Sequence, residues 1–172
     1  MKNYKLLSVA ALLALAACNV NSKTTSNTTD SLPHTDSAKT IGKALFVTMQ
    51  IKDTIKVGDS VLLKFTVHNP ADSVLQFCKW HTPFEPLLSK YLEVKNGTGT
   101  EADYRGAMAK RIMPPPASSY IKVNPKDSLT ATTDLLKAFA ITTPGNYTIT
   151  YVGQNMSGLV SNQTVSFVYL KK

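Results

Sequence analysis

Apolar and polar side chains alternate in short runs over most of this chain. The clearest run covers residues 60–69, where Val61, Leu63, Phe65 and Val67 are separated by single residues. A repeat of two places alternate side chains on opposite faces of a strand. We therefore predict a half-buried β-strand in this run, with the four apolar side chains facing the core.

Less regular versions of the pattern predict further short strands. Their approximate limits are residues 44–52, 73–80, 91–95, 101–104, 120–123, 128–134, 146–152 and 161–170. In the first of these runs, Leu45 and Val47 are expected on one face. In the last run, Val165, Phe167 and Val168 are expected to be the apolar anchors.

Turn-forming residues separate these strands. Residues 53–59, which include Gly58, are predicted as a turn. The irregular segment 105–119 contains three consecutive prolines at 114–116, which exclude a helix or a central strand there. Residues 135–140 are expected to hold one helical turn.

The number and spacing of these runs predict an all-β fold. Eight or nine short strands without a long helical pattern are typical of an antiparallel β-sandwich. We predict an immunoglobulin-like sandwich of about eight strands over residues 41–172, which is one domain by length. Tyr147 follows Gly145 by two residues at the start of a predicted strand. A tyrosine corner would place its tyrosine there.

The N-terminus has the pattern of a secretory signal. Lys2 and Lys5 precede an apolar run over residues 6–17 that contains only one polar side chain, Ser8. A bilayer-spanning helix needs about 20 apolar residues, so this run is too short to span. Its length and its positive flank are those of a signal peptide.

The run ends in a motif that carries its own chemistry, Leu15-Ala16-Ala17-Cys18. It resembles the lipobox of bacterial lipoproteins, in which small residues precede the cut and the cysteine thiol takes a diacylglyceryl group. We predict that residues 1–17 are a signal peptide and that Cys18 is lipidated. The chain would then be held on a membrane in the cell envelope. The alternative is an ordinary secretory signal with a chance cysteine.

Residues 18–40 are almost wholly polar, and Val20 and Leu32 are their only large apolar side chains. Such a segment cannot bury enough surface to offset the entropy of ordering it. We predict a disordered tether between the lipid and the domain, in which His34 is solvated.

The charge and the cysteine content limit which partners and which cross-links are expected. Lys2 and Lys5 account for two of the +8 formal charges, so the chain from Cys18 onward carries +6. This excess would favour anionic headgroups or acidic partners, although a solvated basic surface explains it as well. Export argues against nucleic acid as a partner. Cys78 is the only other cysteine, so no intramolecular disulfide is expected.

No residues are predicted to be catalytic or to bind a metal or cofactor. The three histidines, His34, His68 and His81, do not form the His-Glu-x-x-His pattern of zinc hydrolases. Cys78 and His81 would point to opposite faces of an extended chain, which argues against a thiol–imidazole pair. A buried structural cysteine is the preferred interpretation.

Two short segments are candidates for partner binding. Aromatic residues and a proline leave a predicted strand at residues 80–85, where Glu85 is expected to accept backbone N–H bonds. Aromatic side chains on rigid loops make good interface anchors, but this loop could equally close one end of the sandwich. The second segment is a basic pair, for which the alternative is a solvated loop. The candidate residues are Trp80, Thr82, Pro83, Phe84, Glu85, Lys110 and Arg111.

The order of these motifs resembles the β-sandwich domain that precedes the catalytic domain in deuterolysin-type (peptidyl-Lys) metallopeptidases. The resemblance covers about residues 60–152. Its pieces are Phe65-Thr66-Val67-His68-Asn69-Pro70, Lys79-Trp80-His81-Thr82-Pro83-Phe84-Glu85, Tyr91-Leu92-Glu93-Val94, Tyr104-Arg105-Gly106, Lys110-Arg111 with Pro114, and Pro144-Gly145-Asn146-Tyr147.

In that family a zinc-binding domain with His-Glu-x-x-His follows, and this motif is absent here up to Lys172. A protease label taken from the family would describe the companion domain, so we expect no enzyme activity. The resemblance implies a role in folding assistance, inhibition or docking toward an extracytoplasmic protease. A looser similarity to small proteinase-inhibitor sandwiches points the same way. The alternatives are a structural envelope lipoprotein and an enzyme with an unrecognised site.

Overall fold

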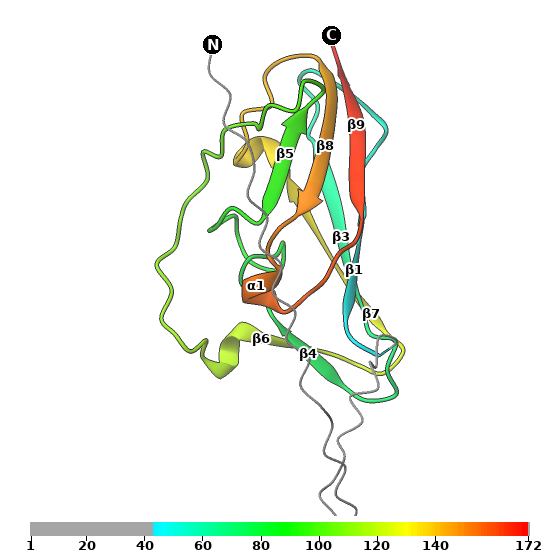
Figure 1. Ribbon diagram of the computed structural model, residues 1–172, viewed down its shortest axis with the longest axis vertical. Coiled ribbons are helices and arrows are strands. Elements are labelled where there is room, and N and C mark those ends of the chain that lie inside the picture. The colour runs from blue at the N-terminus through cyan, green and yellow to red at the C-terminus, as the bar shows by residue number, and fades with distance from the viewer. Residues whose placement is uncertain (1–42, 172) are drawn as a thin grey trace, which may run out of the picture. The chain divides into compact units, whose positions relative to one another are not determined.

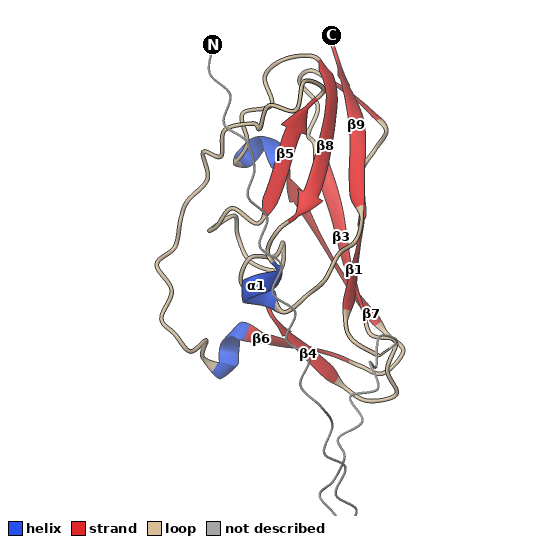
Figure 2. Cartoon of the chain, viewed as in Figure 1, coloured by secondary structure: helices blue, strands red, loops and turns tan. Residues whose placement is uncertain are grey.

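The structure, a computed structural model, describes residues 43–171. The predicted signal peptide, Cys18 and the tether with His34 lie outside the described residues, so those predictions are untested. The described part is mostly β, with one short α-helix and two single 3-10 turns (Figure 2). This agrees with the predicted all-β class.

The described residues form nine strands, all of them short. The strands are β1 (Phe46–Gln50), β2 (Thr54–Lys56), β3 (Leu62–His68), β4 (Leu75–Cys78), β5 (Leu92–Asn96), β6 (Tyr120–Val123), β7 (Ser128–Asp134), β8 (Gly145–Tyr151) and β9 (Thr164–Leu170). The helical pieces are η1 (Ala117–Ser119), η2 (Leu135–Lys137) and α1 (Gln154–Ser157). The predicted helical turn within residues 135–140 is therefore confirmed as η2.

The strands form three sheets, with the orders β1-β3-β7, β2-β9-β8-β5 and β4-β6. All pairs are antiparallel except β2 with β9, which is parallel. In Figure 1, β5, β8 and β9 lie side by side, and β1, β3 and β7 form a second layer. The two-stranded β4-β6 sheet lies toward the end opposite the C-terminus.

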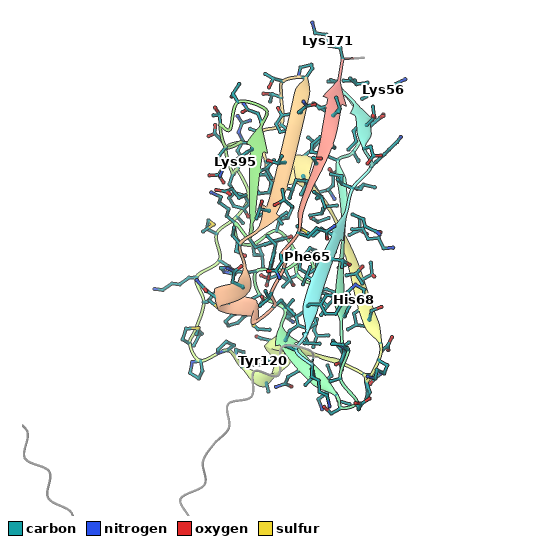
Figure 3. The ribbon with its side chains drawn as sticks, turned by 45° about the vertical axis from the view of Figure 1, so that its right-hand side comes forward. Lys56, Phe65, His68, Lys95, Tyr120 and Lys171 are labelled. Carbon is teal, nitrogen blue, oxygen red and sulfur yellow. The ribbon has the colours of Figure 1, made fainter. Side chains whose placement is uncertain are left out.

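The two larger sheets share one core. Val61, Leu63, Phe65 and Val67 are fully buried, which confirms the alternation predicted for this run. The Phe65 ring on β3 meets the Tyr151 ring on β8 edge to face, with 5.1 Å between the centroids. Figure 3 shows Phe65 midway between Lys171 at one end and Tyr120 at the other.

This core is complete within one compact unit. The described part of the unit is residues 43–171, and its buried apolar side chains run from Leu45 to Tyr169. Since burial of apolar surface is the main stabilising contribution in a domain, the unit has what it needs to fold by itself. A fragment Ser37–Lys172 is therefore a suitable experimental form of the domain.

Tyr147 makes the backbone contact expected of its position. Its hydroxyl donates to the carbonyl oxygen of Thr143 at 2.8 Å. A tyrosine near the start of a strand that bonds a few residues upstream is the geometry of a tyrosine corner. The bond fixes the turn that leads into β8, which begins at Gly145 with φ 149°.

Of two local predictions about strands, the first is incomplete and the second is wrong. Residues 53–59 are not only a turn, because they contain β2, which pairs with the distant β9. Its single buried side chain, Ile55, gives no alternation that a sequence pattern could reveal. Residues 101–104 form no strand, and only isolated bridges from Glu101 to Lys95 and from Tyr104 to Phe139 occur there.

The anchors of β9 and the short helix also differ from expectation. Phe167 is buried as predicted, but Val168 is exposed and Tyr169 is buried instead. Period-two geometry requires this, because neighbours in a strand face opposite sides. The one-turn helix α1 was not predicted, and it ends at Gly158, whose φ of 75° suits a left-handed cap.

Candidate functional site

Residues 80–85 leave β4 and turn inward. Trp80 is only 7% exposed. The Phe84 ring lies edge to face with Phe77 and Phe65, at centroid distances of 5.2 and 6.5 Å. Both predicted aromatic anchors thus contribute to the core, which leaves little of Trp80 for a partner to contact.

Side-chain hydrogen bonds fix this turn internally. Thr82 is fully buried, and its hydroxyl donates to the Lys79 carbonyl at 2.5 Å and accepts from the Phe84 N–H at 3.2 Å. Pro83 is half-buried beside it. His81 has φ 61°, a left-handed conformation that is uncommon outside glycine. The segment is therefore a rigid, packed turn.

Glu85 joins this turn to the irregular segment 105–119. One carboxylate oxygen accepts the His81 backbone N–H at 3.0 Å, as predicted, and also the Arg111 guanidinium at 2.5 Å. The two charged side chains are 5% and 15% exposed. The Arg111 guanidinium also lies 4.8 Å from the centre of the Trp80 ring, a cation–π contact. We call Trp80, Glu85 and Arg111 the internal cluster.

The internal cluster affects the titration of His81. Burial lowers the pKa of His81, the neighbouring Arg111 charge lowers it further, and Glu85 opposes both. The net direction is downward, so the neutral imidazole is favoured in the folded protein.

Lys110 lies outside this arrangement although it precedes Arg111. Lys110 is exposed, as are three apolar neighbours, Met108 at 71%, Ile112 at 82% and Met113 at 62%. Lys110 is therefore at the surface, whereas the solvated-loop interpretation fails for Arg111, which is held by Glu85 and Trp80. These three apolar residues were not predicted as a surface group, because they lie in a proline-rich segment without periodicity.

Backbone contacts hold the exposed stretch in place. The Arg105 N–H donates to the Ala138 carbonyl at 2.6 Å, and the Ala109 N–H donates to the Leu88 carbonyl at 2.7 Å. The Tyr104 hydroxyl donates to the Ala107 carbonyl at 3.0 Å. In Figure 1 this part of the chain, coloured yellow-green between β5 and β6, bows out beside the sheets.

The other residues considered from the sequence, Cys78 and His68, lie in contacts typical of structural residues. Cys78 is a free, buried thiol. His68 shares a 2.8 Å hydrogen bond with the Thr48 hydroxyl, and its ring stacks on Phe46. Over residues 43–171, no three His, Cys, Asp or Glu side chains gather as metal ligands would. In the same range, no helix is long and apolar enough to cross a bilayer.

The structure thus brings five of the seven candidate binding residues into one packed region and leaves Lys110 in solvent. Trp80, Thr82, Phe84, Glu85 and Arg111 support one another, and Pro83 lies at their edge. Cys18 lies outside the described residues. No family model matches the chain, and no curated protein sequence matches it.

Proposed function

We propose that this chain is a lipid-anchored, non-enzymatic binding module of the bacterial cell envelope that associates with an extracytoplasmic protease. Its domain would be an immunoglobulin-like β-sandwich. Two larger sheets around a shared core, nine short strands in the described residues and the Tyr147–Thr143 bond support this finer description of the fold.

The membrane anchor rests on the lipobox-like sequence that ends at Cys18. Replacing Cys18 with serine removes the thiol that would carry the lipid, so the protein should move from the membrane fraction to the soluble fraction. Cys78→Ser is the matched control, because Cys78 lies in the domain and should not affect fractionation. A Cys18→Ser form that stayed with the membrane after its signal peptide had been cleaved would refute the anchor.

The observation that carries the binding role is the exposed apolar group of Met108, Ile112 and Met113 on a segment held by hydrogen bonds. Exposed apolar side chains that gather on one loop are typical of interaction sites. Long irregular loops inside a compact domain are usually functional. The resemblance to the domain that precedes deuterolysin-type metallopeptidases supports a protease as the partner, in an inhibitor-like or pro-segment-like role.

Binding can be tested with the fragment Ser37–Lys172 and a panel of inactivated serine, cysteine and metallo-endopeptidases. We expect a stable complex with at least one of them in calorimetry. A Met108→Ser/Ile112→Ser variant should bind it more weakly. If no enzyme of the panel bound the fragment, the association with proteases would be wrong.

A second candidate, a structural envelope lipoprotein, is favoured by the inward packing of Trp80 and Phe84. In that case every substitution in residues 80–85 and 105–119 would change stability alone. The two functions separate at Met108 and Ile112, where a binding role predicts lost affinity without lost stability.

A further inference from the structure

The exposed part of segment 105–119 has an ordered pattern of side chains. Met108, Lys110 and Ile112 are exposed, whereas Ala109 and Arg111 between them are half-buried. Alternation of this kind is the pattern of an extended chain, in which side chains two positions apart share a side. Their Cα atoms are therefore about 7 Å apart.

The inward side of this stretch is fixed to the body of the domain. Ala109 is held by its N–H bond to the Leu88 carbonyl, and Arg111 is held by Glu85 and Trp80. The exposed side is thus presented in one conformation before any partner arrives. Docking then requires little further ordering, which favours affinity.

The exposed side has a simple chemical sequence of apolar, cationic and apolar groups. Residues 105–119 contain Arg105, Lys110 and Arg111 and no acidic residue. Glu85 offsets the charge of Arg111, and within residues 43–171 Lys110 forms no ion pair. A complementary surface would offer a carboxylate to Lys110 and apolar pockets on either side of it.

The backbone of this stretch favours a protein groove over a bilayer as its binding partner. The N–H groups of Lys110 and Ile112 form no hydrogen bond with another described residue. Hydrocarbon cannot satisfy such groups, so inserting them into a membrane is unfavourable. A protein groove can pair with them as it pairs with an added strand, while its pockets take alternate side chains.

We infer that residues 107–113 bind as an extended peptide in the active-site groove of an endopeptidase whose specificity pocket holds a carboxylate for Lys110. Met108 and Ile112 fill apolar subsites on either side, and the internal cluster keeps the segment rigid behind them. This inference rests on the proposed function, and it specifies both the docking surface and the chemistry of the partner.

The test measures binding of the fragment Ser37–Lys172 to a trypsin-class endopeptidase whose catalytic serine is replaced by alanine. That enzyme keeps its carboxylate pocket and cannot cleave the fragment. An equally inactivated chymotrypsin-class enzyme, with an apolar pocket, is the comparison. We expect the trypsin-class enzyme to bind at least about tenfold more tightly, since a charged pocket partner is worth more than about 1.4 kcal/mol.

Variants then assign the contacts. Lys110→Ala should weaken binding about 30-fold, the loss typical of a central interface residue. Met108→Ser/Ile112→Ser should weaken it about tenfold through lost apolar burial. Lys122→Ala, at another exposed lysine outside segment 105–119, is the matched control and should change the affinity less than twofold.

The outcomes separate this inference from the proposed function. Suppose that an endopeptidase of the panel binds the fragment, but that the Lys110→Ala variant and the unmodified fragment have the same affinity for the trypsin-class enzyme. The inference is then overturned and the proposed function stands. If no endopeptidase binds, both fail. If the fragment instead binds anionic phospholipid vesicles, and does so only with Met108 and Ile112 intact, the surface is a membrane contact and the inference is overturned.

Discussion

Residues 80–85 and residues 107–113 look alike in sequence and behave in opposite ways in the structure. Both are irregular stretches that combine large apolar side chains with charge. The first packs Trp80 and Phe84 inward, whereas the second exposes Met108 and Ile112. The Glu85–Arg111 ion pair joins them. The comparison shows that the aromatic side chains of residues 80–85 pack in the core, whereas residues 107–113 present apolar side chains to a proposed partner.

The difference has an energetic meaning that mutations can test. A buried side chain contributes through the surface it removes from water and through its contacts, so its loss should lower the free energy of unfolding. An exposed side chain contributes little to that quantity and is available to a partner.

Trp80→Ala should have the largest effect. It removes a nearly buried ring and the face on which Arg111 lies, so we expect a loss of about 4 kcal/mol. Urea or guanidinium unfolding of the fragment Ser37–Lys172 measures it. A loss below about 1 kcal/mol would show that residues 80–85 do not support the core, and the comparison would fail.

Glu85→Gln should lower the free energy of unfolding by about 3 kcal/mol, because it leaves the guanidinium of Arg111 partly buried without its counter-charge. The matched control is Asp72→Asn. Asp72 pairs with Lys43 and Lys126 in solvent, where screening by water leaves such pairs with little effect on stability. Equal losses in the two variants would contradict a structural role for the internal cluster.

His81 should make stability depend on pH. Its folded pKa lies below the ordinary 6.5, mainly through burial, so below pH 6.5 the unfolded state binds more protons than the folded state. Stability is then fully present above pH 6.5 and falls as the pH drops toward the folded pKa. Unfolding curves at pH 7.5 and 5 measure the change.

The variant His81→Asn isolates this contribution. Asparagine tolerates a positive φ better than most residues, so it keeps the turn while removing the titrating ring. Its unfolding free energy should change less between the two pH values than that of the unmodified fragment. An unchanged pH dependence would mean that His81 does not contribute to it.

Met108→Ser/Ile112→Ser should have the smallest effect on stability, within about 0.5 kcal/mol, because both side chains are exposed. Thermal unfolding of the variant and of the unmodified fragment provides the measurement. A loss of 2 kcal/mol or more would place these side chains in the core and remove the distinction between the two regions.

The regular part of the fold was predictable from the sequence because its signal is local. In residues 60–69 the apolar residues Val61, Leu63, Phe65 and Val67 occupy every second position, and all four are buried in β3 or directly before it. The turn into β8 was predictable because Tyr147 and Gly145 each have a strong positional meaning. By contrast, β2 owes its existence to pairing with β9 more than 100 residues away. Nothing near β2 in the sequence specifies that pairing.

The site was predictable only in part, because orientation outside regular strands depends on tertiary contacts. The sequence indicated that Glu85 accepts a backbone N–H, and it does. It gave no sign that Arg111 turns inward while Lys110 stays in solvent, since the two share charge and context. Only the position of Glu85 in space separates them. Whether any of these residues binds a partner remains a prediction.

The buried thiol of Cys78 makes local opening of this domain measurable by chemical labelling. In a Cys18→Ser chain it is the sole cysteine, and its sulfur lies on β4, directly before the turn formed by residues 80–85. An alkylating reagent reaches it only when that part of the domain opens, so the alkylation rate counts opening events. Substitutions in the internal cluster should raise the alkylation rate of Cys78, and substitutions at Met108 and Ile112 should leave that rate unchanged.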